Sequence, residues 1–287
     1  MADEIRARFG PAETVLTGSG TEALELAIRL SGMNGSKRRP VGLPAFSCFD
    51  VATAAVGAGA PVLFYDVDPD TLTPESQSLD RVLAESPRAV VVANLFGYPI
   101  DWTSVRDRCR AAGVVLIEDA AQGLGSTWNG RQGGTFGDLT VLSFGRGKGW
   151  TGGSGGSLMV RIQLEMGGLK STLRASSLLR NLSAAATCFA QWALGRPTLY
   201  WLPQAIPGIH LGETRYKTPV PPARMAAFSA ALASFTEAAA AEEIRRRETN
   251  ARKLRDLFLG EGVSGDFKTP NPIPGGSSAY NRFPLLA

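Results

Sequence analysis

An acidic residue and a lysine, twenty-nine positions apart, carry the chemistry that this sequence offers. Asp119 ends the apolar run VVLIED, and Lys148 lies in the glycine-rich stretch SFGRGKGWTGGSGG. A carboxylate at a strand end can keep the pyridine nitrogen of pyridoxal phosphate protonated, so that the ring withdraws electrons. A lysine amine on a loop can anchor the cofactor as a Schiff base and later shuttle protons. The pair makes the chain a candidate transaminase.

Asp119 also needs a cationic partner if folding buries it, because an unpaired buried carboxylate is costly. No lysine or arginine is near it in the sequence, and a protonated ring nitrogen would meet the need. Gln122, three residues later in EDAAQ, could reach the ring hydroxyl from the same turn. The ordinary interpretation of Gln122 is an exposed polar turn residue.

The turn TGSGTEAL provides a candidate phosphate cradle at Gly20 and Thr21. It joins a strand to a helix, and the free amides of a helix N-terminus bind phosphate well. Ser19 and Glu22 also form an S-x-x-E capping box, which could satisfy those amides without a ligand. The turn by itself leaves both interpretations open.

Ser143 ends a predicted strand five residues before Lys148 and could donate its hydroxyl to the same phosphate. Seven glycines lie between Gly145 and Gly156, which permits a close approach of the backbone to a ligand. A mobile surface loop with a solvated lysine is the alternative. A catalytic role for Lys148 is favoured only because Asp119 is also present.

The surrounding elements predict an α/β fold, a three-layer αβα sandwich with a mostly parallel sheet. Continuous apolar runs alternate with helical segments, which is typical of a sheet covered on both faces, and ligands gather at the carboxyl ends of its strands. Asp119 lies at such an end, as do Asp66 and Asn94. The expected strands are TVLTG, RPVGLPAF, PVLFYDVD, AVVVANLF, VVLIEDA, 139–144 and 157–160, and the expected helices are TEALELAIRLSG, 49–58 and TSVRDRCRAAG.

From about Gly167 the chain turns helical, and a proline-rich connector, KTPVPPAR, leads to a long alanine-rich helix over 225–259. The ending YNRFPLLA predicts an opening strand whose partners are absent. We therefore expect a large domain over 1–215, followed over 216–287 by a linker, the long helix and a partial small C-terminal domain.

Composition excludes several classes of protein. The chain has 287 residues, 44% hydrophobic and 20% charged, which favours an ordinary globule over disorder. A net charge of +4 and one interrupted basic cluster, IRRRETNARKLR, indicate a solvated helix face and no nucleic-acid partner. Three cysteines without a close pair favour a reducing compartment, so we expect a cytoplasmic protein. His210 lacks any metal-ligand spacing, and no metal site is expected.

We expect no secretory signal, because the chain opens with charged and polar residues. Membrane contact is not favoured either. The most apolar stretch, SAAATCFAQWAL followed by GRPTLYWLP, is interrupted by Gln191, Arg196 and Pro197. It is too short to span a bilayer and predicts a buried or interfacial helix, with contact at a membrane surface as the less favoured alternative.

Several of these motifs together resemble a known family. The runs GSGTEALELAI, LPAFSCFDVATAAVGAGAPVLFYDVDPDT, VVVANLFGYPIDW and VLIEDAAQGLGSTWNGRQGGTFGDLTVLSFGRGKGWTGGSGGSL resemble, in order and spacing, the DegT/StrS pyridoxal-phosphate-dependent nucleotide-sugar aminotransferases. The likeness runs from about Ile5 to Leu285 and is strongest over 18–158. Its most specific parts are DAAQ, the Gly137–Asp138 pair and S-F-x-x-x-K.

The resemblance implies a homodimer of fold type I with a role for each candidate residue. Lys148 would anchor the cofactor, Asp119 would face the ring nitrogen and Gln122 the ring oxygen. Ser143 and the Gly20–Thr21 turn would hold the phosphate. The implied reaction takes an amino group, usually from glutamate, and passes it to a keto group of a nucleotide-linked sugar, as in polysaccharide biosynthesis.

The sequence departs from the family at three places. SCFD puts Cys48, followed by Phe49, where an aromatic residue usually stacks on the ring. PPARM keeps Arg224, but Pro222 replaces an asparagine that would reach the partner subunit's phosphate. The chain also resembles a family member truncated at both ends, either a fragment or a naturally shortened relative.

Two alternatives accompany the sugar aminotransferase. A sugar dehydratase of the same family would carry histidine in place of Lys148. A non-catalytic relative that serves as a binding or scaffold protein would explain Cys48, Pro222 and the missing termini.

Overall fold

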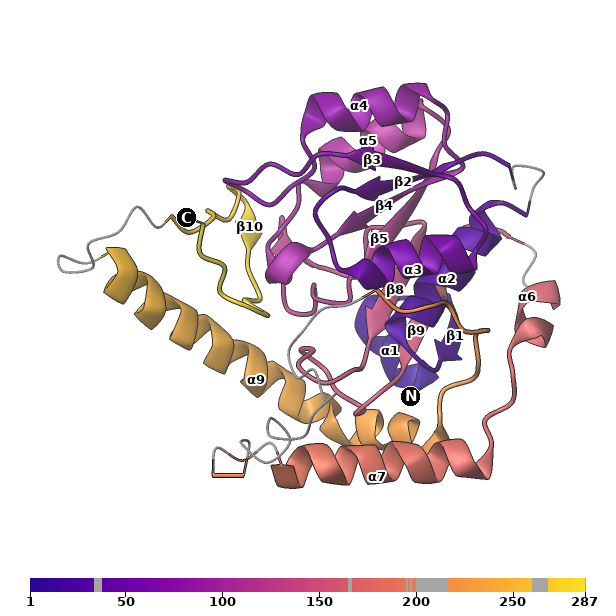
Figure 1. Ribbon diagram of the computed structural model, residues 1–287. Helices are drawn as coiled ribbons and strands as arrows, with labels where there is room; N and C mark the ends of the chain where they lie inside the picture. The colour runs from indigo at the N-terminus through magenta and orange to yellow at the C-terminus, as the bar shows by residue number, and fades with distance from the viewer. Residues whose placement is uncertain are drawn as a thin grey trace.

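A seven-stranded sheet forms the centre of the molecule (Figure 1). The computed structural model describes residues 1–33, 38–164, 167–194, 196, 198–199, 216–259 and 268–286. All strands run parallel except β9, which is antiparallel to both of its neighbours. In spatial order they are β1 (Glu13–Thr17), β9 (Gly156–Val160), β8 (Leu139–Ser143), β5 (Val115–Asp119), β4 (Ala89–Ala93), β2 (Val41–Pro44) and β3 (Val62–Tyr65).

Helices cover both faces of the sheet, which confirms the predicted three-layer α/β fold (Figure 1). Side chains alternate along a strand, so β4 sends Val91 into the core beneath α2 (Gly20–Ser31) and α3 (Phe49–Gly57). Val90 and Val92 enter the core beneath α4 (Ser76–Ala84) and α5 (Trp102–Ala111). A third core lies beneath α1 (Ala2–Phe9) and α9 (Ala227–Leu259).

The predicted strands and helices of the large domain are all present, with ends shifted by a few residues. Two helices, α1 and α4, were not expected from the sequence. The 3-10 helix η1 (Leu95–Gly97) and three two-residue strands were also unexpected. The short strands form a second sheet in the order β10 (Gly276–Ser277), β6 (Thr127–Trp128) and β7 (Arg131–Gln132).

The C-terminal part agrees with the sequence except at its end. The predicted long helix is α9, and the helical region before it comprises α6 (Gly167–Thr172) and α7 (Leu178–Leu194). The prediction of a strand in YNRFPLLA is wrong. The strand of this region is β10, which lies earlier in the chain, and Leu286 forms an isolated bridge with Lys268. The division between residues 215 and 216 stays a prediction, and His210 lies outside the described residues.

The apolar stretch was expected to form a buried or interfacial helix, and helix α7 shows that the buried alternative is wrong. None of its described side chains is buried, and several of its large apolar residues are exposed. Within the described residues, none of the helices combines the length and apolarity needed to cross a bilayer.

Candidate active site

A cavity of about 670 Å³ opens where β1, β5 and β8 end, at the carboxyl edge of the sheet. This is the edge where parallel α/β sheets bind ligands. The structure brings together here every site residue that the sequence predicts, although they come from four separate segments. The cavity is lined by Gly20, Thr21, Asp119, Gln122, Ser143 and Lys148, among others.

Gly20 brings the N-terminus of α2 directly against the end of β8. A Cβ atom at Gly20 would lie 2.8 Å from Cβ and 3.1 Å from Oγ of Ser143, too close for any larger residue. The contact places the Ser143 hydroxyl beside the first turn of α2. The two segments of the predicted phosphate cradle therefore form one surface.

The capping box predicted in this turn is only half formed. The Ser19 hydroxyl accepts a hydrogen bond from the Glu22 amide at 3.1 Å. The Glu22 carboxylate turns away from Ser19 and accepts from the amides of Gly18 at 3.1 Å and Ala223 at 2.8 Å. Neither capping side chain occupies the amides of Gly20 and Thr21, which remain directed at the cavity end of the helix. This arrangement favours the phosphate cradle over simple capping.

Asp119 lies at the end of β5 with a raised pKa. Burial is the main cause, and it is opposed by a 3.0 Å hydrogen bond from the Ala121 amide and by the charge of Lys148. In the part of the chain that the structure describes, Asp119 forms no ion pair, although the charge of Lys148 acts on it. A cation in the cavity would stabilise its ionised form.

Lys148 lies on a loop that α9 supports from outside the cavity. The indole of Trp150 donates to the Ala233 carbonyl at 2.7 Å, and the Thr236 hydroxyl donates to the Thr151 carbonyl at 2.6 Å. Ser154 and Ser229 share a hydrogen bond at 2.8 Å. The glycine-rich segment is therefore fastened to a long helix at three points, which is not the geometry of a free surface loop.

Gln122 lines the cavity, but its side chain also contacts the C-terminal segment. Asn281 donates to the Gln122 amide oxygen at 3.4 Å, and Arg247 of α9 donates to the Asn281 oxygen at 2.6 Å. This network was missed from the sequence, because Gln122 is more than a hundred residues from both Arg247 and Asn281.

Cys48 and Phe49 have different positions relative to the cavity. Cys48 lines it, and burial raises the pKa of its thiol, whereas Phe49 is 51% exposed and is not part of the lining. Of the two candidates for contact with a ring, the geometry favours Cys48.

Glu22 is a second residue of the site that sequence reasoning missed. It is buried, and besides the two amides it contacts Arg180 of α7 at 3.2 Å. Through it the PPARM segment docks beside the turn that precedes α2, where the Gly18 amide donates to the Ala223 carbonyl at 2.8 Å. The available signal was a glutamate in the first turn of an otherwise apolar helix, in TEAL. From the sequence alone, Glu22 is interpreted only as a capping residue.

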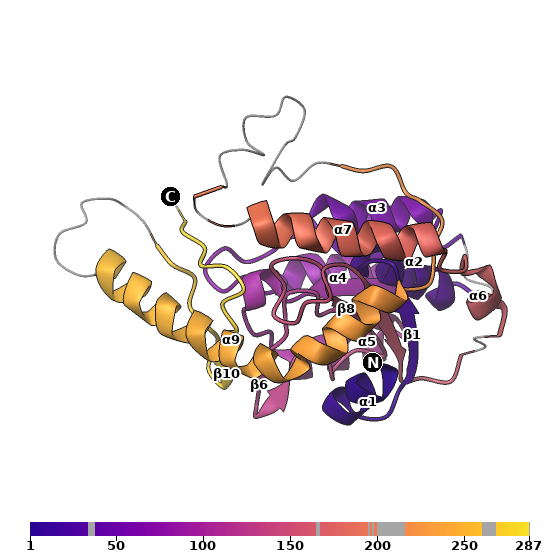
Figure 2. The ribbon, with the colours of Figure 1, turned by 90° about the horizontal axis from the view of Figure 1, so that it is seen from below.

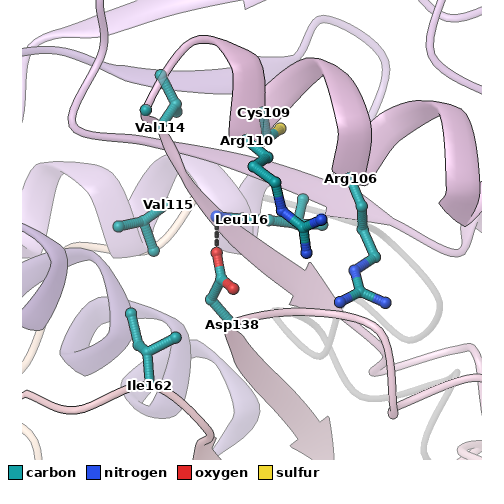
Figure 3. A pocket seen from close by; sticks show the side chains of 9 residues that line it. Arg106, Cys109, Arg110, Val114, Val115, Leu116, Asp138 and Ile162 are labelled. Carbon is teal, nitrogen blue, oxygen red and sulfur yellow. Dashed lines mark hydrogen bonds between the residues drawn. The ribbon is translucent and has the colours of Figure 1, made fainter.

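A smaller cavity of about 270 Å³ lies near the start of β5, at the other edge of the sheet from Asp119 (Figure 3). Arg106 and Arg110 extend from α5 toward it, and Asp138 accepts a hydrogen bond from the Leu116 amide at 2.9 Å (Figure 3). Asp138, part of the specific Gly137–Asp138 motif, thus joins β5 to the start of β8. Asp138 therefore connects two strands of the sheet and does not line the larger cavity.

Comparison with known proteins identifies the family. The sequence profile of the DegT/DnrJ/EryC1/StrS aminotransferase family matches residues 1–166, more than half of the chain. The chain belongs to this family. Within the family match lie all six predicted site residues.

Two curated relatives illustrate the sequence likeness. The dTDP-4-dehydro-2,3,6-trideoxy-D-glucose 4-aminotransferase of Saccharopolyspora spinosa is 37% identical over 134 residues, which are 47% of this chain and 34% of that protein. The GDP-perosamine synthase of Vibrio cholerae is 32% identical over 141 residues, 49% of this chain and 38% of that protein. The chain thus matches little more than a third of the length of these relatives.

A solved structure extends the likeness beyond the sequence match. The aminotransferase TlmJ from Streptoalloteichus hindustanus superposes with a TM-score of 0.68 at 28% identity, covering 98% of this chain and 68% of that protein. The family profile ends at residue 166, so the expected resemblance as far as Leu285 rests on the fold.

Proposed function

We propose that this protein is a pyridoxal-phosphate-dependent transaminase that moves an amino group, from glutamate, to a keto group of a nucleotide-linked sugar. The observation that carries the proposal is the presence of Lys148 and Asp119 in one cavity at the carboxyl edge of the sheet. The family of the chain and the nucleotide-sugar names of its relatives support the reaction class.

The residues of the cavity fit the cofactor. Asp119 is partly buried and its pKa is raised, and a protonated ring nitrogen would stabilise its ionised form more closely than the charge of Lys148 does. The amides of Gly20 and Thr21 and the Ser143 hydroxyl would hold the phosphate, at a helix N-terminus that favours anions. Gln122 would face the ring hydroxyl and Cys48 would contact the ring.

The bound cofactor supplies an electron sink for the carbon atom that gains or loses a proton. Lys148 would anchor it through the side-chain amine and, once released by the incoming amino donor, would carry that proton as general base and acid. Asp119 would hold the proton on the ring nitrogen. The α9 contacts would keep the Lys148 loop in reach of the reacting atoms.

Lysine at position 148 favours transamination over the dehydratase alternative, because the resemblance assigns histidine to that position in dehydratases. The site arrangement also speaks against the scaffold alternative, since a binding protein has no need of a lysine and an unpaired acid in one cavity. Action in the cytoplasm, within polysaccharide biosynthesis, and assembly as a homodimer belong to the same proposal.

Covalent attachment of the cofactor tests the proposal. The purified chain, incubated with pyridoxal phosphate, should show a visible absorbance band that borohydride bleaches, and peptide mass mapping should locate the reduced adduct on Lys148. Lys217 also lines the cavity, so Lys217→Ala is a matched control that should keep the band, while Lys148→Ala should lose it.

Addition of glutamate should then convert the band, which a scaffold protein could not do. A chain that never acquires the band, or an adduct placed on Lys217, would overturn the assignment of Lys148. A band that does not respond to amino donors would support cofactor binding but would reject transamination.

A further inference from the structure

Helix α7 lies at the outer edge of the molecule, beside α9 (Figures 1 and 2). Five of its large apolar side chains are 58% to 78% exposed, although each is of a type that folding normally removes from water. These residues, called here the α7 outer face, are Leu178, Leu179, Leu182, Phe189 and Trp192.

The opposite side of α7 is already held by the protein. Asn181 accepts a hydrogen bond from the Phe228 amide of α9 at 3.2 Å, and Arg180 pairs with Glu22. A Cβ atom at Gly153 would lie 3.5 Å from Cys188, so the helix also packs on the loop of the active site. The helix is therefore anchored through Arg180, Asn181 and Cys188, while Leu178, Leu179, Leu182 and Phe189 remain exposed. Trp192 lies at the boundary, because it is largely exposed and also lines a cavity of about 560 Å³ together with Cys188 and the Lys148 loop.

The sequence around α7 has a one-sided charge. No aspartate or glutamate occurs from residue 166 to 212, whereas lysine or arginine occurs at 170, 174, 180 and 196. The Arg196 guanidinium lies over the Trp192 ring at 4.5 Å, so a cation and an aromatic ring meet at the C-terminal end of the stripe. Leucine, phenylalanine and tryptophan in a segment that has cations and no acidic residue suit the interface of an anionic bilayer.

We propose that the α7 outer face docks on the surface of an anionic lipid bilayer, with the helix lying in the plane of the interface. The acid-free sequence selects this occupant, because a negatively charged headgroup layer complements Arg174 and Arg196, two exposed cations that lie before and after the apolar stripe. Arg180 does not contribute to this complementarity, since it is ion-paired with Glu22. The proposal concerns a surface contact, in agreement with the lack of a spanning helix in the described part of the chain.

Co-sedimentation of the whole chain with vesicles tests the contact. The chain should sediment with vesicles that contain phosphatidylglycerol, bind weakly to pure phosphatidylcholine, and be released as salt screens the headgroups. Leu182→Glu should lower the bound-to-free ratio by about tenfold, because it puts a charge in the middle of the stripe. Leu257→Glu changes a leucine of similar exposure at the far end of α9 and should bind like the unchanged chain.

Circular dichroism melting of both variants separates lost folding from lost docking. Two outcomes would overturn the proposal. One is an equal distribution of the unchanged chain between supernatant and pellet with and without anionic vesicles. The other is a result in which the unchanged chain does not bind vesicles and Leu182→Glu halves the mass of the protein in sedimentation equilibrium. That result would assign the α7 outer face to a contact between two copies of the chain.

Discussion

At the residue scale, the environment of Asp119 disfavours its ionised form unless a cation binds in the cavity. Its raised pKa means that the folded chain holds this proton more tightly than the unfolded chain, so stability falls as pH rises from the ordinary value of 3.8 through the raised value. Without cofactor, the ionised carboxylate is therefore destabilising at neutral pH.

Asp119→Asn should remove this penalty while disabling the site. We expect the cofactor-free variant to melt at a higher temperature than the unchanged chain at neutral pH, with the difference shrinking as the pH is lowered. With cofactor, turnover should fall by about 100-fold or more, because an amide cannot stabilise the protonated ring nitrogen. Calorimetry over a pH series checks the first effect, and a variant that is less stable at every pH would contradict it.

Gly20 is a position where only the smallest residue fits. Gly20→Ala would push a methyl group to 2.8 Å from Ser143, and overpacking of this kind costs about 1–3 kcal/mol. We also expect weaker retention of the cofactor phosphate, measured by dialysis against inorganic phosphate.

The matched control for Gly20 is Gly168→Ala, in α6, where a Cβ atom would meet nothing within 4 Å. This change should be neutral or slightly stabilising, since alanine has the higher helix propensity. Equal loss of stability in the two variants would show that close packing on Ser143 is not what Gly20 provides.

At the scale of elements, α9 connects the C-terminal part of the chain to the loop of Lys148. Thr236→Val removes the hydrogen bond to the Thr151 carbonyl and should cost about 1–2 kcal/mol of stability. It should also slow covalent attachment of the cofactor, because the loop would sample other positions. Rates of appearance of the visible absorbance band measure this.

Thr249→Val serves as the control on the same helix, because the Thr249 hydroxyl donates to the Arg245 carbonyl one turn earlier and, among the described residues, makes no bond to the Lys148 loop. It should leave both stability and attachment rate almost unchanged. An attachment rate that is the same in both variants would mean that α9 does not position the loop.

Elements with strong periodicity could be predicted from the sequence, and those held by distant contacts could not. Seven continuous apolar runs identified the seven strands of the main sheet, because buried parallel strands leave little choice of residue. Helix α4 had a readable signal, with Leu79, Val82 and Leu83 on one face, and was overlooked. The two-residue strands β6, β7 and β10 are too short to show any period.

The ending of the chain was misread for a physical reason. Its apolar residues suggested a strand, but Tyr280 packs edge-on against Tyr98 at 5.8 Å and the Ala279 amide donates to the Gly97 carbonyl. The segment is fixed by these contacts with η1 and not by a strand partner. The same contacts bring Asn281 to Gln122, which no local pattern could have indicated.

At the scale of the whole molecule, several exposed phenylalanines remain outside the cores, and one of them lies beside the active-site cavity. Phe46, Phe49 and Phe64 are each more than half exposed, and Phe49 lies between Cys48 and Asp50, which both line the active-site cavity. An exposed aromatic group next to a binding site indicates a contact surface. A second copy of the chain is the partner expected from the proposed homodimer, and its contact would place the interface at the rim of the cavity.

Phe49→Glu should therefore convert the protein from two copies to one, because it places a charge in an apolar interface. Sedimentation equilibrium measures the mass, and retention of the cofactor should fall with it, since the interface lies beside residues that line the site. Leu257→Glu, an exposed leucine far along α9, is the control and should leave the mass unchanged. A Phe49→Glu variant that retains the mass of two copies would place the dimer interface elsewhere, and an unchanged chain that sediments as one copy at every concentration would reject the homodimer.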